Sequence, residues 1–190
     1  MNFLAHLWLA DRTDTSMAGA VLGDVVRGAD LSAYPDVIAE GVRLHRRVDA
    51  ATDRHPVMQE ARSLWPEGER RYAGILLDLA ADYALVQDWP AFSGEPLSRF
   101  QARAAQAVEA ASTWFLQAGG RASTAAAFEA LLVSYGHEAG IDRAIARTAA
   151  RLRQPAPMHA AAHRWPQAVP LLRAGLPRLL DDLTAVAGAA

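Results

Sequence analysis

The side chains best suited to chemistry lie in residues 45–55, which read HRRVDAATDRH. His45, Asp49 and Asp53 follow one another at four-residue steps within an apolar pattern that is typical of a helix. Because helical residues project at intervals of about 100°, one imidazole and two carboxylates would line one side of that helix. Ionised groups on a face that meets the core need a partner or a metal. The spacing therefore predicts a polar site on this helix.

A second pair of acidic residues lies in a segment that is otherwise apolar. Residues 72–86 read YAGILLDLAADYALV, and their only formal charges are Asp78 and Asp82. Apolar residues nearly all the way round describe a helix that is surrounded by protein. Two carboxylates there must accept bonds from arginines such as Arg71, accept backbone or tyrosine donors, or hold a cation.

Three further candidates lie elsewhere in the first third of the chain. Asp24 stands among apolar neighbours in LGDVVRG, at the end of a helix that we expect to begin after the capping residue Ser16. His6 lies in the apolar run MNFLAHLWLA. A lone histidine on an apolar face is usually a hydrogen-bonded core residue, so by itself His6 favours that interpretation over metal binding. His55 precedes Pro56 and is expected at a helix end or turn.

The donors in this set are imidazole nitrogens and carboxylate oxygens. They suit Mn²⁺, Mg²⁺, Fe or Zn²⁺, and such mixed sets are common where a metal activates water against a phosphoester. The chain has no cysteine, which excludes disulfides and thiolate zinc sites. The triplet of His45, Asp49 and Asp53 is the strongest part of the pattern, because core hydrogen bonding alone rarely explains three ligand-type residues in register.

The elements that must position these side chains are predicted to be helices. A chain of 190 residues suffices for one domain with a substantial core, and we expect residues 1–190 to form it. Alanine and leucine dominate and no alternating strand pattern persists, so the prediction is an all-α, single-domain helical bundle. Helices are predicted over residues 16–27, 35–53, 56–64, 67–88, 96–118, 123–135, 138–153 and 167–186.

The charge balance argues against a simple nucleic-acid binder. The net charge is −2, and all 19 basic residues are arginines. A bound divalent cation would offset several acids and leave six arginines free to face an anionic partner. These are Arg43, Arg46, Arg47, Arg54, Arg70 and Arg71. Without the metal, a solvated arginine surface is the simpler interpretation.

The hydropathy of the chain predicts no association with a membrane. No run reaches the roughly 18 uncharged apolar residues that a spanning helix needs. Residues 1–10 are apolar, but they are too few, lack a basic leader and contain His6. We therefore expect a soluble, cytoplasmic protein.

Four blocks in the first half of the chain stand in a distinctive order. They are MNFLAHLWLA, LGDVVRG around Asp24, YPDVIAEGVRLHRRVDAATDRHP, and RRYAGILLDLAADYAL followed by Trp89. Together they resemble the bacterial acyl carrier protein phosphodiesterase family, whereas the alanine-rich second half adds little. The resemblance implies an all-helical fold that is a divergent relative of the HD-type metal-dependent phosphohydrolases.

The activity implied by the resemblance is hydrolysis of the phosphodiester that links 4′-phosphopantetheine to the serine of holo acyl carrier protein. The implied partner is thus the acidic acyl carrier protein, and the implied setting is fatty acid metabolism. The implied cofactor is a divalent metal, most often Mn²⁺, with Mg²⁺ or Fe possible. The motif residues of the family correspond here to His6, Asp24, Arg27, His45, Arg46, Asp49, Asp53, His55, Asp78 and Asp82.

The resemblance also suggests roles for these residues. We expect metal-assisted attack of water on phosphorus, with Asp24, His45 and Asp49 as the catalytic residues. The expected metal ligands are Asp24, His45, Asp49 and Asp82, with His6 and Asp53 as additional or supporting ligands. Arg27 or Arg46 would bind a non-bridging phosphate oxygen in a forked geometry that lysine cannot reproduce.

One position departs from the family pattern. Where relatives typically have Asp-His, this chain has Asp82-Tyr83. Tyrosine is a poor ligand for Mn²⁺ or Mg²⁺, so a coordinating role for that histidine would make this chain slow, altered in metal choice or inactive. On a helix, however, residue 83 lies about 100° from Asp82 and would face elsewhere.

Two other functions stay open on the sequence alone. A metal-dependent phosphohydrolase of the same scaffold would act on a small phosphoester or nucleotide, because fold and metal site do not fix the substrate. A non-catalytic module that binds carrier protein or a metabolite would retain the polar cluster without turnover. Metal content distinguishes the binding module from the two enzymes, and competition between holo carrier protein and small phosphoesters distinguishes the enzymes.

Overall fold

A computed structural model describes residues 1–188, and this part of the chain folds into helices without a strand, which confirms the all-helical prediction. The helices are α1 (Phe3–Arg12), α2 (Met17–Leu22), α3 (Asp36–Thr52), α4 (Pro56–Arg62), α5 (Arg70–Gln87), α6 (Trp89–Phe92), α7 (Leu97–Ala110), α8 (Ser112–Gln117), α9 (Ala125–Ser134), α10 (Glu138–Ala149), α11 (Ala156–Ala162) and α12 (Trp165–Gly188). Across residues 1–188, every helix is too short or too polar to cross a lipid bilayer.

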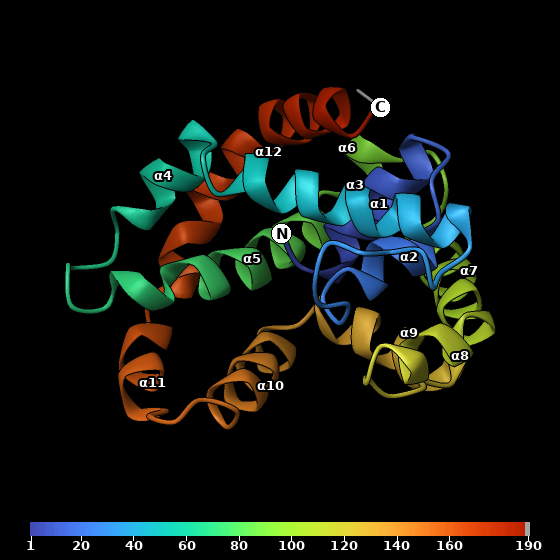
Figure 1. Cartoon of the computed structure of the whole chain (residues 1–190). Helices are drawn as coiled ribbons and strands as arrows, with labels where there is room; N and C mark the ends of the chain where they lie inside the picture. Colours follow the sequence, from blue (N-terminus) through green and yellow to red (C-terminus); the bar gives the residue numbers. More distant parts are fainter. Residues whose placement is uncertain (189–190) are drawn as a thin grey trace.

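Helix α5 runs through the middle of the molecule, with α3 on one side and α10 on the other in the view of Figure 1. It packs against α1, α4, α10, α11 and α12. This position explains its apolar sequence, since most of its residues from Ala73 to Leu85 are buried. Polar groups on α5 therefore need partners inside the protein.

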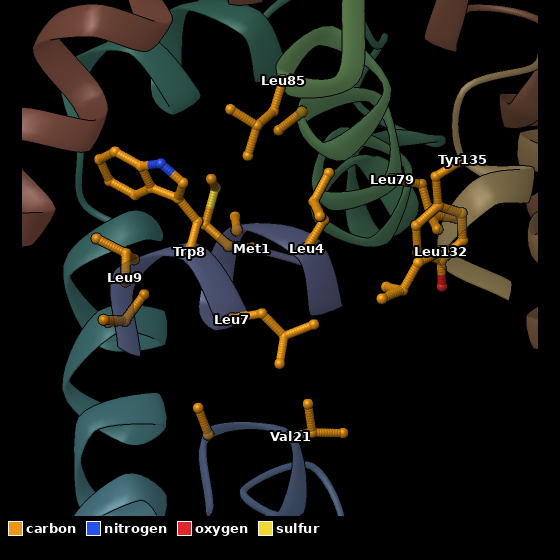
Figure 2. Packing of buried hydrophobic residues seen from close by; sticks show 14 of the residues in the cluster. Met1, Leu4, Leu7, Trp8, Leu9, Val21, Leu79, Leu85, Leu132 and Tyr135 are labelled. Carbon is orange, nitrogen blue, oxygen red and sulfur yellow. The ribbon is translucent and has the colours of Figure 1, made fainter. Parts of the chain in front are cut away.

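Helix α1 is buried along nearly its whole length. The side chains of Leu4, Leu7 and Leu9 are inaccessible to solvent. Figure 2 shows them between Val21 of α2 and Leu85 of α5. Because neighbours cover α1 on every side, a polar side chain on this helix is carried into the interior.

Helices α2 and α3 pack backbone against backbone. A Cβ added to Gly19 would lie 2.5 Å from the carbonyl oxygen of Ile38, and one added to Gly41 would lie 2.7 Å from the Cα of Gly19. Only glycine permits so close an approach. The contact brings the end of α2 against the face of α3 that carries the predicted site.

Two predicted helices are wrong in extent. The helix predicted over residues 16–27 begins after Ser16, whose hydroxyl accepts a hydrogen bond from the Gly19 amide, but it ends at Leu22. Asp24 therefore lies in a turn. The helix predicted over residues 96–118 is interrupted at Ala111, whose backbone leaves the helical region, so that α7 and α8 are separate.

Three helices lie outside the predicted ranges. Helix α1 is apolar on all sides and so has no helical period in its sequence. Helices α6 and α11 are short and carry proline in their first turn, where the missing N–H costs nothing. A proline that looks like a helix breaker in the sequence thus begins a helix in the structure.

Candidate active site

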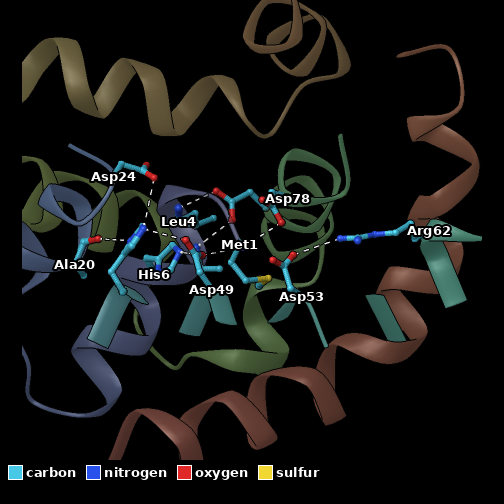
Figure 3. A network of polar contacts seen from close by, with 12 residues as sticks. Met1, Leu4, His6, Ala20, Asp24, Asp49, Asp53, Arg62 and Asp78 are labelled. Atoms are coloured by element: carbon cyan, nitrogen blue, oxygen red, sulfur yellow. Dashed lines mark hydrogen bonds and ion pairs between the residues drawn. The ribbon is translucent and has the colours of Figure 1, made fainter. Parts of the chain in front are cut away.

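His6, His45 and Asp49 come together where α1 meets α3. Nε2 of His6 lies 3.0 Å from Oδ1 of Asp49, and Nε2 of His45 lies 3.1 Å from Oδ2 of the same carboxylate. The two imidazole rings stack with their centroids 4.0 Å apart. One ligand atom from each residue lies within 4.8 Å of the other two. Figure 3 shows Asp49 and His6 between Asp24 and Asp78.

The two helices supply these side chains for different reasons. Helix α3 is amphipathic, and His45 belongs to its buried face with Val42, Leu44 and Val48. Asp49 follows one turn later at the edge of that face, with 45% of its side chain exposed. His6 reaches the same point because α1 is buried on all sides. The cluster is thus buried on its histidine side and open on its carboxylate side.

His45 faces a hydrogen-bond acceptor at each ring nitrogen. Nδ1 donates to the carbonyl oxygen of Ala20 at 2.8 Å. Nε2 faces Asp49 and, at 3.5 Å, Oδ1 of Asp24. With the proton on Nδ1, a neutral imidazole would turn the lone pair of Nε2 toward two carboxylates. A second proton or a metal cation must therefore lie at Nε2.

The electrostatics of the cluster favour that positive charge. Burial lowers the pKa of His45, but the hydrogen bond and charge of Asp49 outweigh burial and leave the pKa above its ordinary value. Burial opposes the ionisation of Asp49, but hydrogen bonds from His45 and His6 prevail and hold the pKa of Asp49 well below its ordinary value. Asp49 is therefore the fixed anion that both Nε2 atoms contact.

His6 is the neutral member of the cluster. Burial lowers its pKa to about 4, although the hydrogen bond to Asp49 acts in the opposite direction. An uncharged His6 that donates from Nε2 to Asp49 keeps a lone pair on Nδ1. That Nδ1 atom is buried and has no hydrogen-bond partner within residues 1–188.

Asp24 lies at the open edge of the cluster. The turn after α2 brings its carboxylate to His45, and about half of its side chain is exposed. Burial of the carboxyl raises the pKa of Asp24, while the charge of His45 acts against the rise. Of the predicted ligands outside the central three, Asp24 is the one in contact with them.

Asp82 binds the backbone at the start of α1 and not the clustered ligands. Its carboxylate accepts hydrogen bonds from the backbone N–H groups of Leu4 and Ala5, at 2.8 Å and 3.1 Å. It therefore satisfies two of the free donors at the N-terminal end of α1, as a capping side chain does. Backbone donors were one of the alternatives for this residue, and the structure confirms them without placing Asp82 among the three clustered ligands.

Asp78 pairs with the α-amino group of Met1. The amino nitrogen is buried, 3.0 Å from Oδ1 of Asp78 and 3.6 Å from Oδ1 of Asp49. The suggestion that Arg71 holds Asp78 is wrong, since the Arg71 guanidinium lies over the ring of Tyr72.

Asp53 and His55 lie away from the cluster. Asp53 is largely exposed and pairs with Arg62 at 3.3 Å. His55 begins α4, as predicted, where its Nδ1 accepts from the amide of Val57 and its Nε2 donates to Asp182 of α12 at 3.1 Å. These contacts connect α4 with α12 and involve none of the clustered ligands.

The two arginines predicted to bind phosphate lie beside the turn that holds Asp24. Arg46 donates to the carbonyl oxygen of Val26 at 3.3 Å. Arg27 follows Val26 in the chain and is exposed. Both are therefore near the open edge of the cluster, and their binding role stays a prediction.

The expectation of six free arginines is wrong for two of them. Arg43 and Arg47 both pair with Glu40, and Arg47 also donates to the carbonyl oxygen of Ala187. Arg70 donates to the carbonyl oxygen of Trp65. Arg46 and Arg71 have the uncharged partners given above, so these three arginines keep a charge that no acid among residues 1–188 neutralises. The first half of the chain thus offers fewer unpaired cations than its sequence suggests.

Tyr83 faces away from the cluster. Its ring packs edge-on against Trp165 of α12, with the centroids 5.3 Å apart. Asp82, one residue earlier, points instead to the start of α1. The helical projection predicted this separation, and it removes Tyr83 from direct contact with the candidate ligands.

The cluster fits a divalent cation by the chemistry of its donors. Mn²⁺, Fe and Zn²⁺ accept imidazole nitrogen together with carboxylate oxygen. The bond from Nδ1 of His45 to a backbone carbonyl is the support that metal-binding histidines usually have. The half-exposed carboxylates of Asp24 and Asp49 leave a side open to solvent and substrate.

Sequence reasoning missed a pocket that begins at Asp24. Its volume is about 450 Å³, and its lining includes Asn2, Tyr135, Arg147 and Arg151. Nothing in the sequence connects α10 with the start of the chain, so no local signal identifies these residues. Gly23 was also missed: a Cβ added there would lie 2.5 Å from Cβ of His45. Its place beside Asp24 in LGDVVRG was a usable signal.

The family model and the curated relatives that match this chain carry the same name. The family model described as acyl carrier protein phosphodiesterase matches residues 1–182. Proteins named acyl carrier protein phosphodiesterase from Salmonella agona (strain SL483) and Enterobacter sp. (strain 638) are each 44% identical over 101 residues, which is 53% of this chain and 52% of theirs. The chain thus spans about half the length of the curated relatives it matches. No solved structure gives a significant match.

Proposed function

This chain belongs to the acyl carrier protein phosphodiesterase family, and on that premise we propose that it hydrolyses the phosphodiester of holo acyl carrier protein. The products are apo acyl carrier protein and 4′-phosphopantetheine. The observation that carries the proposal is the contact of one carboxylate, Asp49, with the Nε2 atoms of both His6 and His45.

The proposed enzyme depends on a divalent metal, with Mn²⁺ preferred and Mg²⁺ or Fe as alternatives. His6, His45 and Asp49 would hold it, with Asp24 at the open edge. Such an ion supplies Lewis acidity, which lowers the pKa of water and neutralises charge on phosphoryl oxygens. The grouping of histidine and aspartate on neighbouring helices also supports a divergent HD-type scaffold.

The residues of the chain position the reacting groups. Asp49 orients both imidazoles, and the carbonyl of Ala20 fixes His45 with Nε2 toward the open side. Arg27, which is exposed, would meet a non-bridging oxygen of the phosphodiester, where a guanidinium forms two parallel bonds. The serine oxygen of the carrier protein takes a proton from water as it leaves.

A mass measurement tests the proposal directly. Holo acyl carrier protein is incubated with the purified protein and Mn²⁺, beside a chelated control and the His45→Ala variant. We expect the carrier protein to lose the mass of one phosphopantetheine group with metal and wild-type protein only. A fully active His45→Ala variant would overturn the site.

The same assay distinguishes the alternative functions. A folded, metal-loaded protein that leaves holo carrier protein intact but cleaves small phosphodiesters would be a phosphohydrolase of another specificity. A protein that binds carrier protein without metal and cleaves neither substrate would be a binding module. Both results contradict the proposed reaction.

A further inference from the structure

The pocket that begins at Asp24 has the size of a small-molecule site. Its volume is about 450 Å³, within the range of about 300–1,000 Å³ that ligand pockets occupy. Because Asp24 also contacts His45, the pocket and the clustered ligands share an edge. A substrate held at the cluster would therefore have this pocket as its neighbour.

Part of the pocket wall consists of hydrogen-bonding groups. The side-chain amide nitrogen of Asn2 is buried and forms no hydrogen bond of good geometry within residues 1–188, and the Asn2 side chain lies beside the hydroxyl of Tyr135. The ring of Tyr135 is also buried, and burial raises the pKa of its hydroxyl, which stays protonated. An unpaired buried donor costs free energy until a ligand supplies an acceptor.

The rest of the wall combines apolar surface with positive charge. Phe3, Leu79 and Leu131 supply the apolar part. Arg147 lies in the last turn of α10 and Arg151 in the turn that follows the helix; both are exposed, and neither forms an ion pair within residues 1–188. Such a wall suits an elongated ligand that carries amides, methylene groups and one anionic end.

Resting on the proposed function, we propose that this pocket holds the pantetheine arm of the substrate. The arm has two amides for the donors near Asn2 and Tyr135, and an aliphatic stem for the apolar wall. Arg147 and Arg151 supply the positive charge that its phosphate requires. These two arginines are thus specificity residues, whereas the clustered histidines serve the reaction itself.

Direct binding of the product and of its dephosphorylated form tests the pocket. The affinities of wild-type protein for 4′-phosphopantetheine and pantetheine are measured by calorimetry. We expect the phosphorylated compound to bind about tenfold more tightly, as charge-assisted hydrogen bonds confer. Arg147→Gln and Arg151→Gln should each remove most of that difference in affinity. Thr148→Leu adds bulk to the pocket wall and should weaken the binding of both compounds.

A matched control separates pocket effects from the general charge of α10. Arg143→Gln removes one charge from the same helix at an exposed position outside the pocket, and it should bind both compounds as the wild type does. Circular dichroism and thermal unfolding establish that every variant is folded. In steady-state assays, the pocket variants should raise KM for holo acyl carrier protein more than they lower kcat.

Failure of the pocket and failure of the proposed reaction give different results. The protein could cleave holo carrier protein and yet fail to bind the two compounds, or bind them equally well in Arg147→Gln, Arg151→Gln and Thr148→Leu. Either result overturns the pocket and leaves the reaction standing. Binding that follows the predicted pattern without cleavage overturns the reaction and leaves the pocket standing. Absence of both binding and cleavage overturns the two together.

Discussion

Gly23 and His45 occupy positions in which a side chain on one would exclude the other. A Cβ added to Gly23 would lie 2.5 Å from Cβ and 2.6 Å from Cδ2 of His45. The turn that ends α2 therefore leaves room for the imidazole only because residue 23 has no side chain. The same turn carries Asp24, so one short segment both admits His45 and supplies its neighbour.

We expect Gly23→Ala to displace the imidazole of His45 and to lower activity severely. Overpacking of this kind costs about 1–3 kcal/mol in the free energy of unfolding. Thermal unfolding and turnover of holo acyl carrier protein measure the two effects. Gly94→Ala is the matched control, because an added Cβ there meets nothing within 4 Å. Equal activity of the two variants would show that His45 does not need its observed position.

Asp49 and Asp53 provide a test of which carboxylate belongs to the site. Asp49→Asn removes the common partner of His6 and His45, and we expect activity to fall more than about 100-fold. Even replacing a residue that only supports the ligands of a metal lowers metal affinity or activity by about 10–100-fold. Asp53→Asn breaks an exposed pair with Arg62 and should change activity less than about twofold. Kinetics across a Mn²⁺ titration measure both. A severe loss in Asp53→Asn would restore that residue to the ligand set.

The geometry of α3 explains why the sequence predicted one part of this site and not the other. The helix predicted over residues 35–53 is observed at Asp36–Thr52, because its amphipathic pattern is clear. Four-residue steps on a helix advance by about 40°, so Asp49 stays beside His45 while Asp53 rotates about 80° away. The equal four-residue steps therefore did not bring Asp53 as close to the cluster as Asp49.

Contacts between distant segments were beyond the reach of local patterns. The pairing of Asp82 with the start of α1 spans 78 residues, and α1 itself has no helical period in its sequence. The pocket arginines, Arg147 and Arg151, line the same pocket as Asn2 only because of tertiary packing. In each case the sequence shows the polar residue itself, but its partner depends on how the helices pack.

Removal of metal should lower the stability of the wild-type protein and leave His45→Ala unaffected. A ligand that binds only the folded state adds about 2.7 kcal/mol to the free energy of unfolding at 100 times its Kd. Thermal unfolding with Mn²⁺ and with a chelator measures the difference. An equal response to Mn²⁺ in wild type and His45→Ala would place the ion elsewhere.

His55 should matter for stability and not for turnover. His55→Ala removes the N-cap of α4 and the bond to Asp182, and we expect a loss of about 1–2 kcal/mol in the free energy of unfolding. His159→Ala, at an exposed position on α11, is the control and should be neutral. Denaturant unfolding and assays well below the unfolding temperature separate the two effects. Loss of kcat in folded His55→Ala would assign it to the reaction.

Asp82 should make the stability of the protein depend on pH. Burial raises the pKa of Asp82 from 3.8 to about 7, although hydrogen bonds from Leu4 and Ala5 act in the opposite direction. Between these two values the folded state binds a proton that the unfolded state releases. The contribution of Asp82 to stability is therefore complete below about pH 4 and is lost as the pH rises to about 7.

The Asp82→Asn variant isolates this contribution, because asparagine does not titrate. We expect the free energy of unfolding to fall more steeply between pH 4 and pH 7 in the wild type than in the variant. The comparison uses the difference between the pH slopes of the wild type and the variant. Asp49 and the other carboxyls titrate in both proteins, so their contributions to the slopes cancel. The Leu4 and Ala5 amides bond to different oxygens of Asp82, and asparagine replaces one of these oxygens with an NH2 group that cannot accept. A lower stability of the variant at every pH is therefore expected and leaves the slopes unaffected. Parallel curves would mean that Asp82 stays ionised in the folded protein and that its two backbone bonds outweigh burial.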